Sequence, residues 1–140
     1  VTGPPFPAQG LVTGSLTLHA TDTFGFATLD QIFTADYAIG DTSVTAFLSK
    51  RDDAAAALSL VQAYATFLLA NGGRQVETRL AIPSAQAIEI LDSFELIFAQ
   101  GSWFAGVHMS DDLVMGLQLV DRLNSALSVH ATPQAPGGAP

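Results

Sequence analysis

The alternation of apolar and polar residues is strongest over residues 94–107, where it predicts a β-hairpin. The chain is expected to turn back at Gln100-Gly101 and to place Phe98 opposite Trp103. One face of this ribbon is then wholly apolar. Because side chains alternate between the two faces of a strand, that face must be covered by another element.

A second alternating stretch, residues 33–49, predicts another hairpin around a turn at Gly40-Asp41. Pairing Ile39 with Thr42 gives one apolar face and one mostly polar face, which is typical of an antiparallel sheet covered on one side. Shorter alternating runs predict additional strands at residues 15–19, 74–82 and 87–91. The last of these could also be a short helix, but Ile88 and Ile90 favour a strand.

Two segments have the apolar spacing of helices. The first is predicted over residues 54–70, after an N-cap at Asp52 or Asp53 and before a stop at Asn71-Gly72-Gly73. Apolar residues surround most of this helix, so we expect it to be buried on more than one side. The second helix follows Ser110, its predicted cap, and presents one apolar face.

Together these elements predict an α+β fold. Its antiparallel β-sheet is built from two hairpins plus extra strands, and two main helices pack on one face as a two-layer sandwich. We expect a single domain over residues 15–128. An extended Pro/Gly-rich arm (1–14) precedes it, and a Pro/Gly/Ala-rich tail (129–140), which includes a solvated His130, follows it.

The composition narrows the classes of partner. Apolar residues make up 49% of the chain and charged residues 13%, whereas about 25% charged residues is usual. This low content of charged residues is typical of a subunit whose faces are covered by other subunits. A net charge of −8 disfavours nucleic acid and anionic lipid surfaces. No apolar run is long enough to predict a membrane-spanning segment, and the absence of cysteine excludes thiolate chemistry.

The segment from Glu95 to His108, followed by an Asp-Asp helix start, resembles the C-terminal part of the DUF6599 family. Members of this uncharacterised bacterial family are often preceded by export signals. The likeness lies mainly in residues 33–127, and it implies a shared fold and an extracytoplasmic (periplasmic or secreted) location. It implies no site residues, because the family has no established activity.

The best polar cluster is His108 with Asp111 and Asp112, placed where a strand ends and a helix begins. These residue types could form a metal or acid–base site. We favour the alternative, a strand-end histidine beside carboxylates that a helix N-terminus attracts. His19 with Asp22 is a second pair of the same kind. No phosphate loop, dinucleotide fingerprint or nucleophile elbow is present, so no cofactor is expected.

Side chains on the second faces of the two ribbons point to a partner. Phe47, Ile97 and Phe104 fall on these faces, and we expect them to form an apolar patch for another protein. Glu95 is expected to face solvent, with pairing to Arg79 as the alternative.

The sequence therefore favours a non-catalytic, exported accessory or scaffold subunit that acts through protein–protein contacts, with other subunits or with a second copy of itself. The alternative is a small-ligand or divalent-cation-binding module near His108 and Asp111. An acid–base hydrolase is a third possibility. It would need two carboxylates or a His–Asp pair in a cleft.

Overall fold

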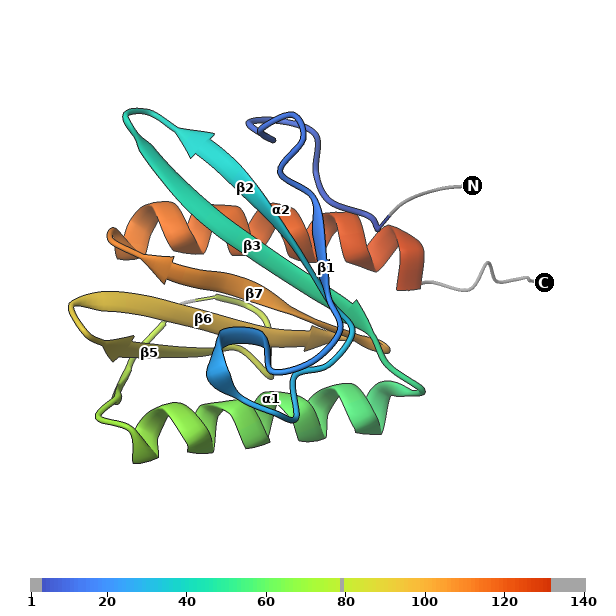
Figure 1. Ribbon diagram of the computed structural model, residues 1–140, viewed down its shortest axis with the longest axis vertical. Helices are drawn as coiled ribbons and strands as arrows, with labels where there is room; N and C mark the ends of the chain where they lie inside the picture. Colours follow the sequence, from blue (N-terminus) through green and yellow to red (C-terminus); the bar gives the residue numbers. More distant parts are fainter. Residues whose placement is uncertain (1–3, 79, 132–140) are drawn as a thin grey trace.

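The computed structural model describes residues 4–78 and 80–131 of the chain, and it confirms the predicted α+β class. Seven strands form one antiparallel sheet in the order β1-β2-β3-β7-β6-β5-β4 (Figure 1). The strands are β1 (Thr17–His19), β2 (Ile32–Ile39), β3 (Thr42–Lys50), β4 (Arg74–Val76), β5 (Gln86–Ile90), β6 (Ser93–Gln100) and β7 (Trp103–Ser110). The helices are α1 (Ala54–Ala70), α2 (Leu113–Ala131) and a short 3-10 helix, η1 (Thr23–Gly25).

The two long helices lie on opposite faces of this sheet (Figure 1), so the prediction that both pack on one face is wrong. Helix α1 shares a core with Phe47 and Ile97, whereas α2 shares a core with their chain neighbours Leu48 and Leu96. Consecutive residues of a strand point to opposite faces. The central strands are apolar on both faces, and each face therefore needs its own helix.

The register of the first hairpin is confirmed, since Ile39 pairs with Thr42. The second hairpin is shifted by two residues from the prediction, because Phe98 pairs with Ala105 and Gln100 with Trp103. Its turn is Gly101-Ser102, and Gly101 adopts a φ of +56° that glycine takes readily. A two-residue shift keeps every side chain on its face, so the predicted apolar face is preserved.

The helix ends follow the expected chemistry with one change of residue. Asp53 caps α1, accepting a hydrogen bond from Ala56 N at 2.8 Å. Asp112, and not Ser110, accepts from the first turn of α2, at 3.0 Å from Met115 N. Ser110 Oγ instead donates to the carbonyl of Asp112. Helix α2 also continues to Ala131, three residues beyond the predicted end of the domain at residue 128.

Two predicted segments differ in the structure. Strand β4 ends at Val76 although the alternation continues to Ile82, because the apolar residues beyond it pack on the α2-side core from a loop. Part of the predicted arm pairs with β2: Ala38 N donates to Gly10 O at 2.8 Å, and Val12 N to Asp36 O at 2.9 Å. In the described residues, no helix has the length and apolar character needed to cross a membrane. Most of the predicted tail lies outside the described residues.

Candidate functional site

A buried carboxylate, Glu95, lies at the centre of the main polar cluster. Its side chain is 1% exposed. One oxygen accepts a hydrogen bond from Tyr64 OH on α1 at 2.7 Å, and the other accepts from Met109 N at 2.7 Å. The expectation that Glu95 faces solvent is wrong, because α1 covers the face of β6 on which it lies. Its alternative partner, Arg79, lies outside the described residues.

The tyrosine of this cluster is held as a hydrogen-bond donor. Burial raises the pKa of Tyr64 well above its ordinary range, and the negative charge and hydrogen bond of Glu95 raise it further. The phenol therefore stays protonated at any physiological pH. Its proton ties α1 to strand β6 through Glu95.

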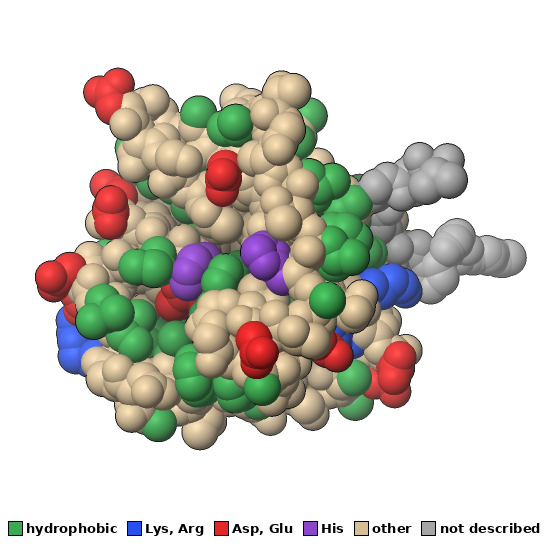
Figure 2. Space-filling view, viewed as in Figure 1, with side chains coloured by type: hydrophobic (Ala, Val, Ile, Leu, Met, Phe, Trp, Pro, Cys, Tyr) green, Lys and Arg blue, Asp and Glu red, His purple; other side chains and the backbone are tan. Residues whose placement is uncertain are grey.

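His108 completes the cluster. Its Nδ1 lies 2.6 Å from Glu95 Oε2, which is ion-pair distance when the imidazole is protonated, although Nδ1 makes no hydrogen bond of standard geometry. The ring of Phe24, from η1, stacks on the imidazole with centroids 3.7 Å apart. The His108 side chain remains 23% exposed. In the view of Figure 2, histidine side chains (purple) lie near the middle of the molecule, beside hydrophobic ones.

The backbone around His108 is strained at two positions. Phe24 and Met109, the two residues that hold the cluster from either side, adopt φ values of +56° and +51°. A left-handed conformation costs about 1–2 kcal/mol for a residue with a side chain. The Phe24 ring contacts and the Met109 hydrogen bond to Glu95 are the interactions that offset this strain.

Of the other predicted candidates, Asp111 and His19 bond to residues outside this cluster. Asp111 and Asp112 are exposed at the start of α2, where Asp111 accepts a hydrogen bond from Ser93 Oγ at 3.4 Å. His19 Nε2 lies 3.0 Å from Thr34 Oγ1, and Asp22 has a left-handed backbone before η1. Within residues 4–78 and 80–131, no group of three or more such side chains is placed to hold a metal ion.

The patch expected for a partner is not at the surface. Phe47, Ile97 and Phe104 are all buried in the core beneath α1. Their positions on the second faces of the ribbons were predicted correctly, but the element that covers them is a helix of the same chain. These three side chains therefore form no exposed apolar surface.

The largest run of exposed apolar side chains lies at the outer edge of the sheet. Strand β1 has a neighbour on one side only, and Leu16 and Leu18 are each 49% exposed there. Leu11 and Val12, beside β2, are exposed as well. No Asp, Glu, Lys or Arg occurs before Asp22 in the chain. We call residues 10–21 the neutral edge.

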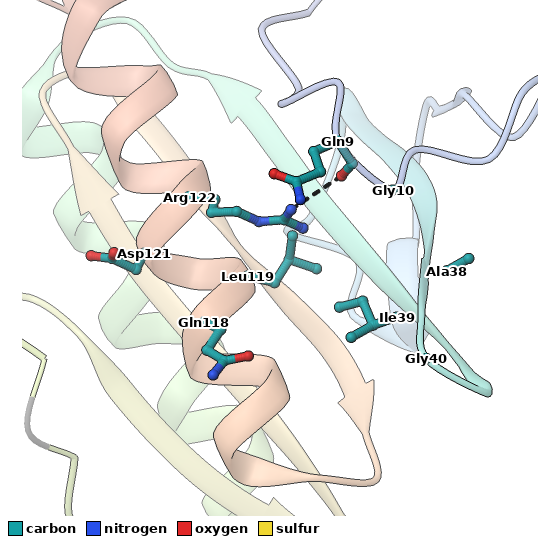
Figure 3. Close-up of a pocket in the computed structure, with 9 residues that line it drawn as sticks. All are labelled: Gln9, Gly10, Ala38, Ile39, Gly40, Gln118, Leu119, Asp121 and Arg122. Atoms are coloured by element: carbon teal, nitrogen blue, oxygen red, sulfur yellow. Dashed lines mark hydrogen bonds between the residues drawn. The ribbon is translucent and has the colours of Figure 1, made fainter.

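A pocket of about 600 Å³ lies on the opposite side of the sheet from α1. Figure 3 shows it between α2, the end of β2 and the N-terminal segment, with Arg122 reaching from the helix toward Gln9. Arg122 Nη1 donates to Gln9 O at 3.2 Å, and its guanidinium lies 5.7 Å from the centre of the Tyr37 ring. No sequence pattern predicts this pocket, because its walls come from three distant segments.

No family model, curated protein or solved structure matches the chain. The resemblance to the DUF6599 family therefore stays a prediction.

Residue parity alone places Glu95 and His108 on the same face of the sheet, and the register of the second hairpin then brings them together. Glu95 shares a face of β6 with Ile97, and His108 shares a face of β7 with Phe104. Once Ile97 and Phe104 are assigned to one face, the acid and the histidine follow onto it. What the sequence lacks is any sign that α1 covers this face.

Proposed function

We propose that the chain is an accessory or scaffold subunit, not an enzyme, and that it assembles through the neutral edge with a second copy of itself. This proposal rests on the observation that Leu16 and Leu18 are half-exposed at the outer edge of the sheet, in a segment (residues 10–21) that contains no charged residue. An outer strand presents unpaired backbone groups that another strand can complete.

The charge distribution favours this surface for self-association. The chain carries a net charge of −8, so most contacts between two copies would bring carboxylates together. The neutral edge avoids that cost, since it holds no carboxylate. Natural sheet edges are commonly protected by lysine, by proline or by inward-pointing charges, and residues 10–21 contain none of these.

The strand is also complementary to itself. In an antiparallel pair centred on Leu18, Leu16 of one copy would lie opposite Ala20 of the other, on one face. Thr17 would lie opposite His19 on the other face, where a hydroxyl and an imidazole can hydrogen-bond. A two-fold axis through Leu18 would then join the two sheets into one, as in the closed dimers that are common among proteins.

Sedimentation velocity over a range of protein concentrations tests this proposal. The wild-type chain should form a dimer, and Leu18→Lys should shift it to the monomer because two lysines would face each other at the centre of the contact. Val129→Lys, an equally drastic change at an exposed position of α2, should leave the dimer intact. A wild-type chain that stays monomeric at its solubility limit, or a dimer unaffected by Leu18→Lys, would refute the proposal.

The alternative function, a small-ligand or divalent-cation module near His108 and Asp111, has weaker support. His108 contacts Glu95 and Phe24, whereas Asp111 bonds to Ser93. Calorimetric titration with Zn²⁺ would support this alternative if it gave a heat of binding that the variant His108→Gln lacked. The extracytoplasmic location also stays a prediction, which cell fractionation would test.

A further inference from the structure

Arg122 differs from the other arginines that the structure describes. Arg51 pairs with Asp30 at 2.8 Å, and Arg74 pairs with Glu89. Arg122, like Lys50, lies over an aromatic ring and has no such ion pair. Arg122 has one hydrogen bond, to a backbone carbonyl, and among the described residues no carboxylate lies within ion-pair distance of it. In a chain with an excess of eight acidic charges, this leaves a guanidinium with most of its five N–H donors unused.

The surroundings of Arg122 form a cavity of ligand size. The volume of about 600 Å³ falls within the about 300–1,000 Å³ that is usual for small-molecule sites. Leu119 and Ile39 lie between the helix and β2, and Gln9 and Gly10 close the opposite side (Figure 3). The carboxylate of Asp121 also lines the pocket, but Figure 3 shows it on the other side of α2 from Arg122.

The segment that closes the pocket is held in place by specific contacts. Tyr37 OH donates to Pro7 O at 2.6 Å, and burial raises the pKa of Tyr37 to about 12, so the phenol stays a neutral donor. Gly10 has a φ of +83°, and a Cβ there would lie 3.1 Å from Ala38 O. Glycine at this position allows the segment to lie close against β2 and to form a wall of the pocket.

We infer that this pocket binds a small organic monocarboxylate. The carboxylate would pair with the free donors of Arg122, whose planar fork matches two carboxylate oxygens. A short apolar body would rest against Ile39. A single negative charge fits better than a doubly charged phosphate, because one arginine must offset it within a strongly acidic molecule. This inference does not require assembly through the neutral edge, although Gly10 belongs to both surfaces.

Ligand titration followed by protein NMR tests the inference with a matched pair of probes. Hexanoate should shift the amide signals of residues around Gly10 and Arg122 saturably, and hexanamide, which has the same body without the charge, should bind at least about tenfold more weakly. Inorganic phosphate should bind more weakly than hexanoate. Equal binding of hexanoate and hexanamide, or tighter binding of phosphate, would overturn the assignment.

Substitutions of Arg122 test whether this residue contacts the bound carboxylate. Arg122→Gln should weaken hexanoate binding by about tenfold to a hundredfold, the usual effect of losing a charged hydrogen-bond partner. Arg122→Lys keeps the charge but loses the fork, so an intermediate affinity is expected. Arg74→Gln removes the same charge from an exposed position on β4, at the other end of the sheet from the pocket, and should change the affinity little. The amide signal of Gly10 reports whether the N-terminal segment stays in place. Unchanged hexanoate binding by Arg122→Gln would refute the site.

Discussion

At the scale of single residues, Glu95 shows how a buried charge is accommodated. A buried carboxylate is costly unless its oxygens accept hydrogen bonds. Tyr64 and Met109 donate such bonds from α1 and β7, and His108 Nδ1 lies 2.6 Å from Oε2. The three partners make this carboxylate a tie between the sheet and one of its helices.

Removing one donor to Glu95 should therefore be costly. Tyr64→Phe leaves a carboxylate oxygen without its hydrogen bond, and we expect the free energy of unfolding to fall by about 1–3 kcal/mol. Urea denaturation measures this loss. The matched control is Tyr37→Phe, which removes a bond to Pro7 in the less buried N-terminal segment and should cost less. A larger loss for Tyr37→Phe would contradict the account of the cluster.

The surface ion pair between Arg51 and Asp30 should contribute to the loss of folding stability at low pH. The hydrogen bond from Arg51 holds the pKa of Asp30 below its ordinary 3.8. The folded state thus gains stability from the ionised carboxylate above the unfolded pKa and loses it as the pH falls through the lower folded pKa. Because Asp30 is half exposed, we expect at most about 1 kcal/mol.

Comparison of melting temperatures between pH 7 and pH 2 checks this expectation. The wild-type chain should be more stable than Asp30→Asn at neutral pH, and the difference should vanish at the acid end. Asp41→Asn, in the β2–β3 turn, serves as the control. A difference that grows on acidification would show that the sign is wrong.

At the scale of elements, several features that depend only on neighbouring residues were predicted correctly. The Asp53 cap, the bounds of α1 and the register of the first hairpin depend on neighbouring residues only. The second turn was misplaced because Gly101 can occupy either central position of a two-residue turn. The face that each helix covers, and hence the burial of Glu95, depends on how distant segments meet, and no short pattern encodes it.

Strand β7 contains one position, Gly106, at which close packing leaves no room for a side chain. A Cβ at Gly106 would lie 2.0 Å from the carbonyl oxygen of Leu96 and 2.7 Å from the Phe47 ring. Backbone cannot move away as a flexible side chain can. Gly106→Ala should therefore destabilise the fold by about 2–4 kcal/mol.

Thermal or urea unfolding of Gly106→Ala measures this cost. The control is Gly25→Ala, where a Cβ meets no atom within 4 Å but the φ is +81°, so only the backbone penalty of about 1 kcal/mol is expected. Similar losses for the two variants would show that the close approach at Gly106 is relieved by movement of the sheet.

At the scale of the whole molecule, charge should govern association. Acidic side chains are spread over the visible face in Figure 2, and two copies repel each other at long range. If the contact is the neutral edge, added salt screens this repulsion and removes no attraction across the interface. We therefore expect the dimer to become tighter between low salt and about 0.15 M ionic strength.

Sedimentation equilibrium at several salt concentrations measures this trend, with sucrose at matched density as the control for excluded-volume effects. A dimer that weakens as salt is added would have ion pairs at its interface. In that case the contact would lie on a charged surface of the molecule and not on residues 10–21.

The position of β7 has a consequence for how the chain is made. This strand joins the β1-β2-β3 half of the sheet to the β6-β5-β4 half, yet it is the last strand to leave the ribosome. Until residue 110 emerges, the two groups of strands have no strand between them to pair with. The sheet face that α2 covers stays exposed until that helix has also emerged. Cooperative folding of the sheet therefore begins only after β7 has emerged, and a fragment that ends before Trp103 forms no stable fold.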